Sequence, residues 1–245
     1  MNTIVANSYN ELQKLVTRRV TKLFFGVALS IPFIVKLVVN KLFITDWMAL
    51  PSENINFSIL DLFITIILPL FIFIAATYLF TGESERGTLL IVRPISRIEL
   101  YLTKTAAISI IIMFQLLMTW LSIIISSVLF DQSFHFSSLL TSLAASLLSW
   151  VPLIVLTSLA IVLALLVNSS VLAISSMIFL YLLMFVLPYL FPNVMYLLPS
   201  SYLDWYMQWF RNMSIQWLIQ TFTYLCSSFA LYFCTGYFIF SKKEV

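Results

Sequence analysis

The chain has 245 residues, of which 62% are hydrophobic and only 9% are charged. Soluble domains carry about 25% charged residues, so this composition predicts a protein that folds in lipid rather than in water. The net charge of +3 forms no broad basic face, which argues against nucleic-acid binding, and one His with two separated Cys offers no metal-ligand cluster.

The segment before the first apolar run, residues 1–22, is polar and contains no signal-peptide pattern. At helical spacing, one face of residues 10–22 is charged and the other is apolar. The charged face holds Glu11, Lys14, Arg18 and Lys22, and the apolar face holds Leu12, Leu15, Val16 and Val20. This pattern predicts an amphipathic helix on the inner membrane surface. The alternative is a plain extension that only fixes the orientation of the first span.

Six apolar runs approach or exceed the roughly 20 residues that a helix needs to cross a bilayer. They cover residues 23–43, 59–80, 105–130, 139–167, 171–191 and 215–240. The predicted fold class is therefore all-α, a polytopic membrane protein with six transmembrane helices in a single domain, residues 1–245. Pro152 lies inside the long fourth run, which predicts a tilt or a kink there.

The basic residues predict the orientation of the spans. Six spans put both termini on one side, and that side carries ten of the thirteen Lys and Arg residues. Because cytoplasmic segments are enriched in Lys and Arg, both termini are expected in the cytoplasm. The composition suits the cytoplasmic membrane of a bacterium.

A charged island, residues 81–104, separates the second run from the third and holds three Glu, three Arg and one Lys. Gly82 and Gly87 have the spacing of a phosphate-binding loop. Thr88 stands where that loop requires Lys, and the two Glu residues between the glycines would repel phosphate. We therefore expect no nucleotide site on this chain.

Polar residues recur on one helical face of the third run, and they are Gln115, Thr119, Ser122 and Ser126. Small polar side chains of this kind are typical of helix–helix packing in membranes. The alternative is that these four residues line a substrate path.

The segment between the fifth and sixth runs, residues 192–214, is rich in Trp and Tyr. Asp204, Gln208 and Arg211 fall on one side at helical spacing. This predicts an interfacial or re-entrant helix at the outer surface, with Trp205 and Trp209 at an external interface. The alternative is an aromatic belt that caps the sixth span.

Other function classes have little support in the sequence. The motifs of hydrolases and metalloproteases are missing, so an enzyme is not expected. Lys36 and Asp61 lie near the outer ends of the first two spans, where an ion pair would be structural. A secondary transporter working without ATP would show inverted repeats or ionisable residues at the midplane, and neither is visible. That class, or a non-transporting membrane scaffold, is the alternative reading.

The charged island resembles the cytoplasmic loop that follows the second span in ABC-2-type transporter permeases. Those proteins commonly read Glu-x-Glu-x-Gly-Thr-Leu, then Pro-x-Ser-Arg, then a Lys that opens the third span. The matching residues here are Glu83, Glu85, Gly87, Thr88, Leu89, Pro94, Ser96, Arg97 and Lys104. One departure is Leu90, where the family often has Glu. The number of spans, the N-terminal helix and the external helical loop are also similar.

The resemblance implies a membrane permease subunit whose ATP and Mg²⁺ are bound by a separate ABC ATPase chain, with no cofactor of its own. It implies a second permease copy, identical or related. Residues 82–99 would form a short coupling helix that contacts the ATPase through Glu83, Glu85, Arg86, Gly87, Thr88, Pro94, Ser96 and Arg97. Export would be more common than import. The expected substrate is hydrophobic or amphipathic, such as a peptide antibiotic or bacteriocin, a drug or a lipid-linked molecule.

Overall fold

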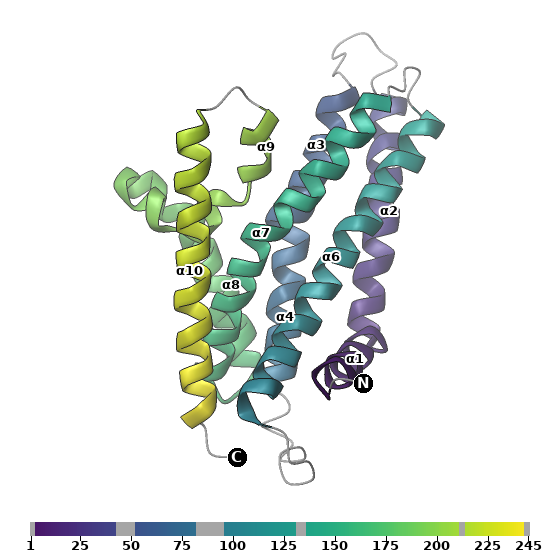
Figure 1. The fold of residues 1–245 in the computed structure, drawn as a ribbon. Coiled ribbons are helices and arrows are strands. Elements are labelled where there is room, and N and C mark those ends of the chain that lie inside the picture. Colours follow the sequence, from purple (N-terminus) through teal and green to yellow (C-terminus); the bar gives the residue numbers. More distant parts are fainter. Residues whose placement is uncertain (1–2, 43–51, 82–95, 131–135, 211–213, 243–245) are drawn as a thin grey trace.

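The computed structural model describes residues 3–42, 52–81, 96–130, 136–210 and 214–242. All regular structure in these ranges is helical, and the helices form an elongated bundle (Figure 1). In chain order they are α1 (Thr3–Val16), α2 (Arg19–Leu42), α3 (Ser52–Leu62), η1 (Phe63–Ile67), α4 (Leu68–Phe80), α6 (Arg97–Phe130), α7 (Phe136–Leu166), α8 (Ser170–Leu190), η2 (Pro192–Leu197), η3 (Pro199–Tyr202), α9 (Trp205–Phe210) and α10 (Ile215–Lys242).

Six of these stretches are long and apolar enough to cross a membrane, which confirms the predicted number of spans. They correspond to α2, the continuous unit of α3, η1 and α4, and then α6, α7, α8 and α10. Each predicted apolar run falls on one of them. α6 begins eight residues before the predicted run at 105–130 and starts at Arg97, because a helix continues into water beyond the segment that lipid requires to be apolar.

The second span changes its helical register at η1, which is a π-helix. Pro69 follows at the start of α4 and has no N–H. It cannot donate to the carbonyl of Thr65, four residues earlier. The hydroxyl of Tyr181, on α8, donates to that carbonyl at 2.6 Å. The proline is thus tolerated because a neighbouring helix pairs with the backbone group that it leaves free.

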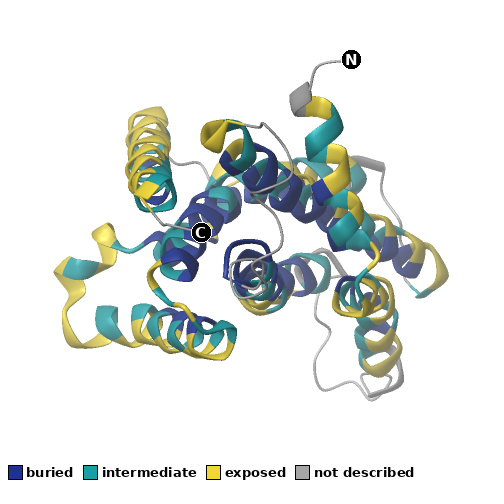
Figure 2. Cartoon of the chain, turned by 90° about the horizontal axis from the view of Figure 1, so that it is seen from below, coloured by how far each residue is buried: buried dark blue, intermediate teal, exposed yellow. Residues whose placement is uncertain are grey.

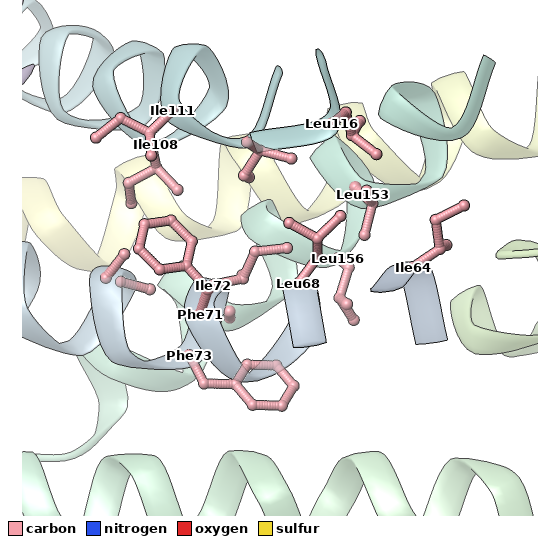
Figure 3. Packing of buried hydrophobic residues seen from close by; sticks show 14 of the residues in the cluster. Ile64, Leu68, Phe71, Ile72, Phe73, Ile108, Ile111, Leu116, Leu153 and Leu156 are labelled. Atoms are coloured by element: carbon pink, nitrogen blue, oxygen red, sulfur yellow. The ribbon is translucent and has the colours of Figure 1, made fainter. Parts of the chain in front are cut away.

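The core lies between α4, α6 and α7 (Figure 3). Phe71 and Ile72 of α4 lie close to Ile108 of α6 and Leu156 of α7, and all four are buried. Buried residues gather in the middle of the bundle, and exposed ones follow its outer helices (Figure 2). α8 and α10 keep most of their apolar surface outward, as expected for helices that face lipid.

The N-terminal helix differs from its prediction in its bounds and in its buried face. α1 spans Thr3–Val16, a turn follows at residues 17–18, and α2 then begins at Arg19. α1 packs against α6. Glu11, expected on the charged face, is buried beside Leu15, and its carboxylate pairs with Lys14 at 2.7 Å. Packing against α6 therefore determines which face of α1 is buried. The sequence prediction assumed contact with the membrane surface alone and could not include this packing.

Candidate functional site

The last turn of α4 and the first turns of α6 meet at one end of the bundle, and we call residues 78–81 together with 96–104 the α4–α6 junction. α1 and the end of α10 lie at the same end (Figure 1). The ammonium group of Lys104 donates to the carbonyl of Leu79 at 2.6 Å and lies 5.5 Å from the ring centroid of Phe80. Lys104 is only 4% exposed. Its positive charge is favourable there, because the end of a helix carries partial negative charge on unpaired carbonyls.

Each residue in the last turn of α4 contacts a different part of the bundle. The guanidinium of Arg18, between α1 and α2, stacks on the ring of Tyr78. The ring of Phe80 makes edge contacts with Tyr101 of α6 and also packs on α10. The hydroxyl of Thr81 donates to the carbonyl of Ala164 in α7 at 2.7 Å. A displacement of this turn would therefore act on α6, α7 and α10 and on the turn between α1 and α2.

The start of α6 is held just as firmly. The backbone N–H of Glu99 donates to the hydroxyl of Ser96 at 3.4 Å, in the manner of an N-terminal helix cap. The guanidinium of Arg97 donates to the carbonyl of Ser241 near the end of α10. Ser96 and Arg97 are thus the two predicted coupling residues that the structure places, and Arg97 links the first turn of α6 to the sixth span.

Tyr101 lies at a contact between α6 and α10. Its hydroxyl donates to the carbonyl of Phe233 at 3.3 Å, and its ring contacts Phe233 and Tyr237. A Cβ on Gly236 would come within 2.4 Å of the Tyr101 oxygen. The glycine is therefore required by this contact.

The other six predicted coupling residues lie outside the described residues, and they are Glu83, Glu85, Arg86, Gly87, Thr88 and Pro94. The contacts described for the α4–α6 junction therefore involve residues at the two ends of the charged island, and none of them involves its centre.

The predicted polar face of the third span is fully inside the bundle. Its four residues, Gln115, Thr119, Ser122 and Ser126, are all buried. The hydroxyl of Ser122 donates to the carbonyl of Leu29 in α2 at 2.7 Å, and that of Thr119 donates to the carbonyl of Gln115 at 2.9 Å. Both amide atoms of Gln115, which is 2% exposed, lack a hydrogen-bond partner among the described residues. Most buried amides are paired, so Gln115 is the member that packing alone does not explain.

A polar cluster farther along α6 was not foreseen from the sequence. Lys36 of α2 donates to the hydroxyl of Ser127, which lies 3.4 Å from the side-chain oxygen of Asn56 in α3. Asp61 instead accepts a hydrogen bond from Thr65, at 3.4 Å. The ion pair expected between Lys36 and Asp61 is thus replaced by two separate polar contacts. The sequence signal was a lysine in an apolar run, but Ser127, which accepts its hydrogen bond, lies on another helix, α6.

The aromatic segment between the fifth and sixth spans, predicted to be external, forms η2, η3 and the short helix α9 in its described part. Trp205 is 2% exposed, lies among Val155 and Leu225, and stacks with Phe222. Trp209 is 47% exposed. The two tryptophans, predicted together at an external interface, therefore differ, since Trp205 fills the bundle and only Trp209 offers its ring to the surroundings.

In the part of the chain that the structure describes, no three His, Cys, Asp or Glu side chains gather as a metal site would require.

Comparison with protein families identifies the family of this chain. The model of the family described as "ABC-2 family transporter protein" matches residues 4–245, whereas no curated protein matches the chain. Members of that family are membrane permeases that lack a nucleotide-binding domain and act with ABC ATPase subunits, so no cofactor is expected on this chain. This match confirms the resemblance carried by the charged island. The chain belongs to the ABC-2 transporter family and is one of its multi-pass membrane permeases.

Proposed function

We propose that this permease exports a hydrophobic or amphipathic substrate and is driven by a separate ABC ATPase that contacts residues 82–99. The observation that carries the proposal is the α4–α6 junction. Both ends of the charged island are bonded to other spans, through Thr81 on one side and Arg97 on the other. A force applied to the island would therefore reach α7 and α10 as well as α4 and α6.

We infer the orientation of the chain in the membrane from the distribution of its basic residues. Ten of the thirteen basic residues fall on the side of the termini and the charged island, which supports a cytoplasmic location for that side. The ATPase is a soluble cytoplasmic protein in this arrangement. α1 would lie at the membrane surface beside it, and α9 at the opposite surface.

Two permease copies, identical or related, would form one transporter, with α8 and α10 offering apolar surface to lipid or to the second copy. ATP binding would shift the pair between inward-open and outward-open states, because the ATPase favours one of them. Gln115, Thr119, Ser122 and Ser126 would face the substrate in one state and the bundle in the other. A peptide antibiotic or bacteriocin, a drug or a lipid-linked molecule would each fit, and among these we propose the peptide antibiotic or bacteriocin.

Purification of the tagged chain from its own membranes in mild detergent tests the proposal, with the co-purifying proteins identified by mass. We expect a stoichiometric ABC ATPase. If no ATPase co-purifies even after gentle cross-linking, the proposal fails, and a secondary transporter or a scaffold becomes the better account.

A further inference from the structure

Three positively charged side chains lie within one helical turn where α1 ends and α2 begins, and they are Arg18, Arg19 and Lys22. We call these three residues the basic turn. The backbone N–H of Lys22 donates to the carbonyl of Arg18 at 3.1 Å, so all three belong to the same turn of helix. Arg19 and Lys22 are exposed, and Arg18 is half-buried. The contacts of the α4–α6 junction use only Arg18 among them.

No carboxylate neutralises the basic turn among the described residues. The one acidic residue in the first 22 positions of the chain is Glu11, and its carboxylate pairs with Lys14 at 2.7 Å. Within the part of the chain that the structure describes, Arg19 and Lys22 make no ion pair and no side-chain hydrogen bond. The turn therefore keeps an excess of positive charge that attracts an anion.

The guanidinium of Arg18 is already held in a position from which it can bind. Its flat face stacks on the ring of Tyr78, in the last turn of α4. Stacking uses the face of a guanidinium and leaves the N–H donors on its edge available. Such an edge matches the geometry of phosphate oxygens, and both arginines and the lysine are donors that bind phosphate.

The basic turn lies where the first span would enter the membrane. α2 is long and apolar enough to cross from Arg19 to Val39, and its apolar run starts directly after Lys22. Lys and Arg side chains at the end of a span lie in the headgroup region, with their stems along the apolar surface. The anions that lie at this depth are the phosphates of lipids.

The exposed side of α2 continues from these cations as an apolar surface. Leu23 is 61% exposed and Ile34 is 57% exposed, and a Cβ on Gly26 would meet nothing within 4 Å. Leu23 and Ile34 lie three turns apart on the same side of the helix, a distance of roughly 16 Å. Half of a hydrocarbon core of about 30 Å is nearly the same length. This side of α2 therefore matches an acyl chain of one leaflet.

We propose that the basic turn binds the headgroup of an anionic phospholipid, whose acyl chains lie along the exposed side of α2. The three cations attract the phosphate at the membrane surface, where no cavity is needed, and the apolar side of α2 contacts the chains. Because Arg18 also stacks on Tyr78, the bound lipid holds the turn between α1 and α2 against the α4–α6 junction. This lipid site goes beyond the proposed function and depends neither on the ATPase nor on the transported substrate.

The test compares two lipids with the same acyl chains, phosphatidylglycerol, which is anionic, and phosphatidylcholine, which has no net charge. Each is titrated into the purified, delipidated protein in mild detergent, and the bound lipid is counted by native mass spectrometry. We expect phosphatidylglycerol to bind about tenfold or more tightly than phosphatidylcholine. The double variant Arg19→Gln, Lys22→Gln should lose this preference and keep its binding of phosphatidylcholine. Arg18 stays unchanged, so its contact with Tyr78 is preserved.

A charge-matched variant and a soluble anion serve as controls. Lys242→Gln, Lys243→Gln also removes two positive charges, and Lys242 is an exposed residue at the end of α10. We expect this variant to keep the preference within about twofold. Each variant should elute as a single species. Glycerol phosphate, which has the headgroup anion without acyl chains, should not displace the lipid at concentrations at which the lipid saturates its site.

Four results would overturn the lipid site. They are equal binding of the two lipids to the wild type, a preference that persists in Arg19→Gln, Lys22→Gln, an equal loss of preference in Lys242→Gln, Lys243→Gln, and displacement of the lipid by glycerol phosphate. The last result would assign the basic turn to a free phosphate compound instead of a lipid.

Discussion

The ammonium group of Lys104, in α6, donates to the main-chain carbonyl of Leu79, in the last turn of α4, at 2.6 Å. The contact joins the two helices that border the charged island. It also satisfies one of the carbonyls that every helix leaves unpaired at its end. The bonds of Thr81 to α7 and of Arg97 to α10 connect the α4–α6 junction to two further spans.

Replacing Lys104 with Met should destabilise the protein by about 1.5–3 kcal/mol, because a charge-assisted hydrogen bond disappears and a buried carbonyl loses its partner. The loss is measured as a lower midpoint temperature for the disappearance of the monodisperse peak after heating. Lys242→Met, at an exposed lysine near the end of α10, is the control and should change little. Equal stability of Lys104→Met and the wild type would show that this hydrogen bond does not stabilise the protein.

Gly236→Ala should destabilise the bundle by about 1–3 kcal/mol, because the added methyl group meets the Tyr101 oxygen at the α6–α10 contact. Gly26→Ala is the matched control, since a Cβ there meets nothing within 4 Å. Thermal stability is again the measurement. In the double variant with Tyr101→Phe the colliding oxygen is gone, so part of the loss should return. Additive effects of the two substitutions would show that the contact is not the cause.

The two tryptophans of α9 should behave differently. Trp205→Ala leaves a cavity among Val155, Leu225 and Phe222 and should cost about 3–5 kcal/mol. Trp209→Ala should cost much less, because nearly half of that side chain is already exposed. The comparison is made by thermal unfolding in the same detergent. A larger effect at Trp209 would indicate that the exposed ring has a partner that stabilises the protein.

Gln115→Leu tests the interior of the third span. The substitution removes two unpaired amide atoms, so stability should stay the same or rise by about 1 kcal/mol. The range of transported substrates should nevertheless change if Gln115 faces the substrate in one of the two transport states. The measurement is the accumulation of a panel of amphipathic compounds in cells that carry each form. An unchanged range would assign Gln115 to packing alone.

The spans were predictable from the sequence, because a helix that crosses a bilayer must be apolar over about 20 residues. Each of the six apolar runs corresponds to a helix in the structure. The register change at η1 was not predicted. The carbonyl of Thr65 within η1 is paired by Tyr181, which lies more than a hundred residues later and reaches that carbonyl only in the folded bundle.

At the candidate site, Ser96 and Arg97 were predicted as coupling residues, but the contacts that they make were not. The cap that the Ser96 hydroxyl forms with the backbone N–H of Glu99 is seen only in the structure. The partners of Lys36 and Arg97 could not be predicted, because hydrophobic patterns do not reveal which helices become neighbours. Glu11 is the clearest example, since its spacing assigned it to the charged face and packing against α6 buried it.

The central claim is that residues 82–99 transmit the ATP-driven conformational change of the ATPase to the spans. The most direct measurement is ATP hydrolysis and substrate export by the reconstituted complex, compared between the wild type and the double variant Glu83→Lys, Glu85→Lys. The account predicts that the variant inserts and folds normally but loses the hydrolysis that accompanies transport. A variant that still couples hydrolysis to export at the wild-type rate would contradict it.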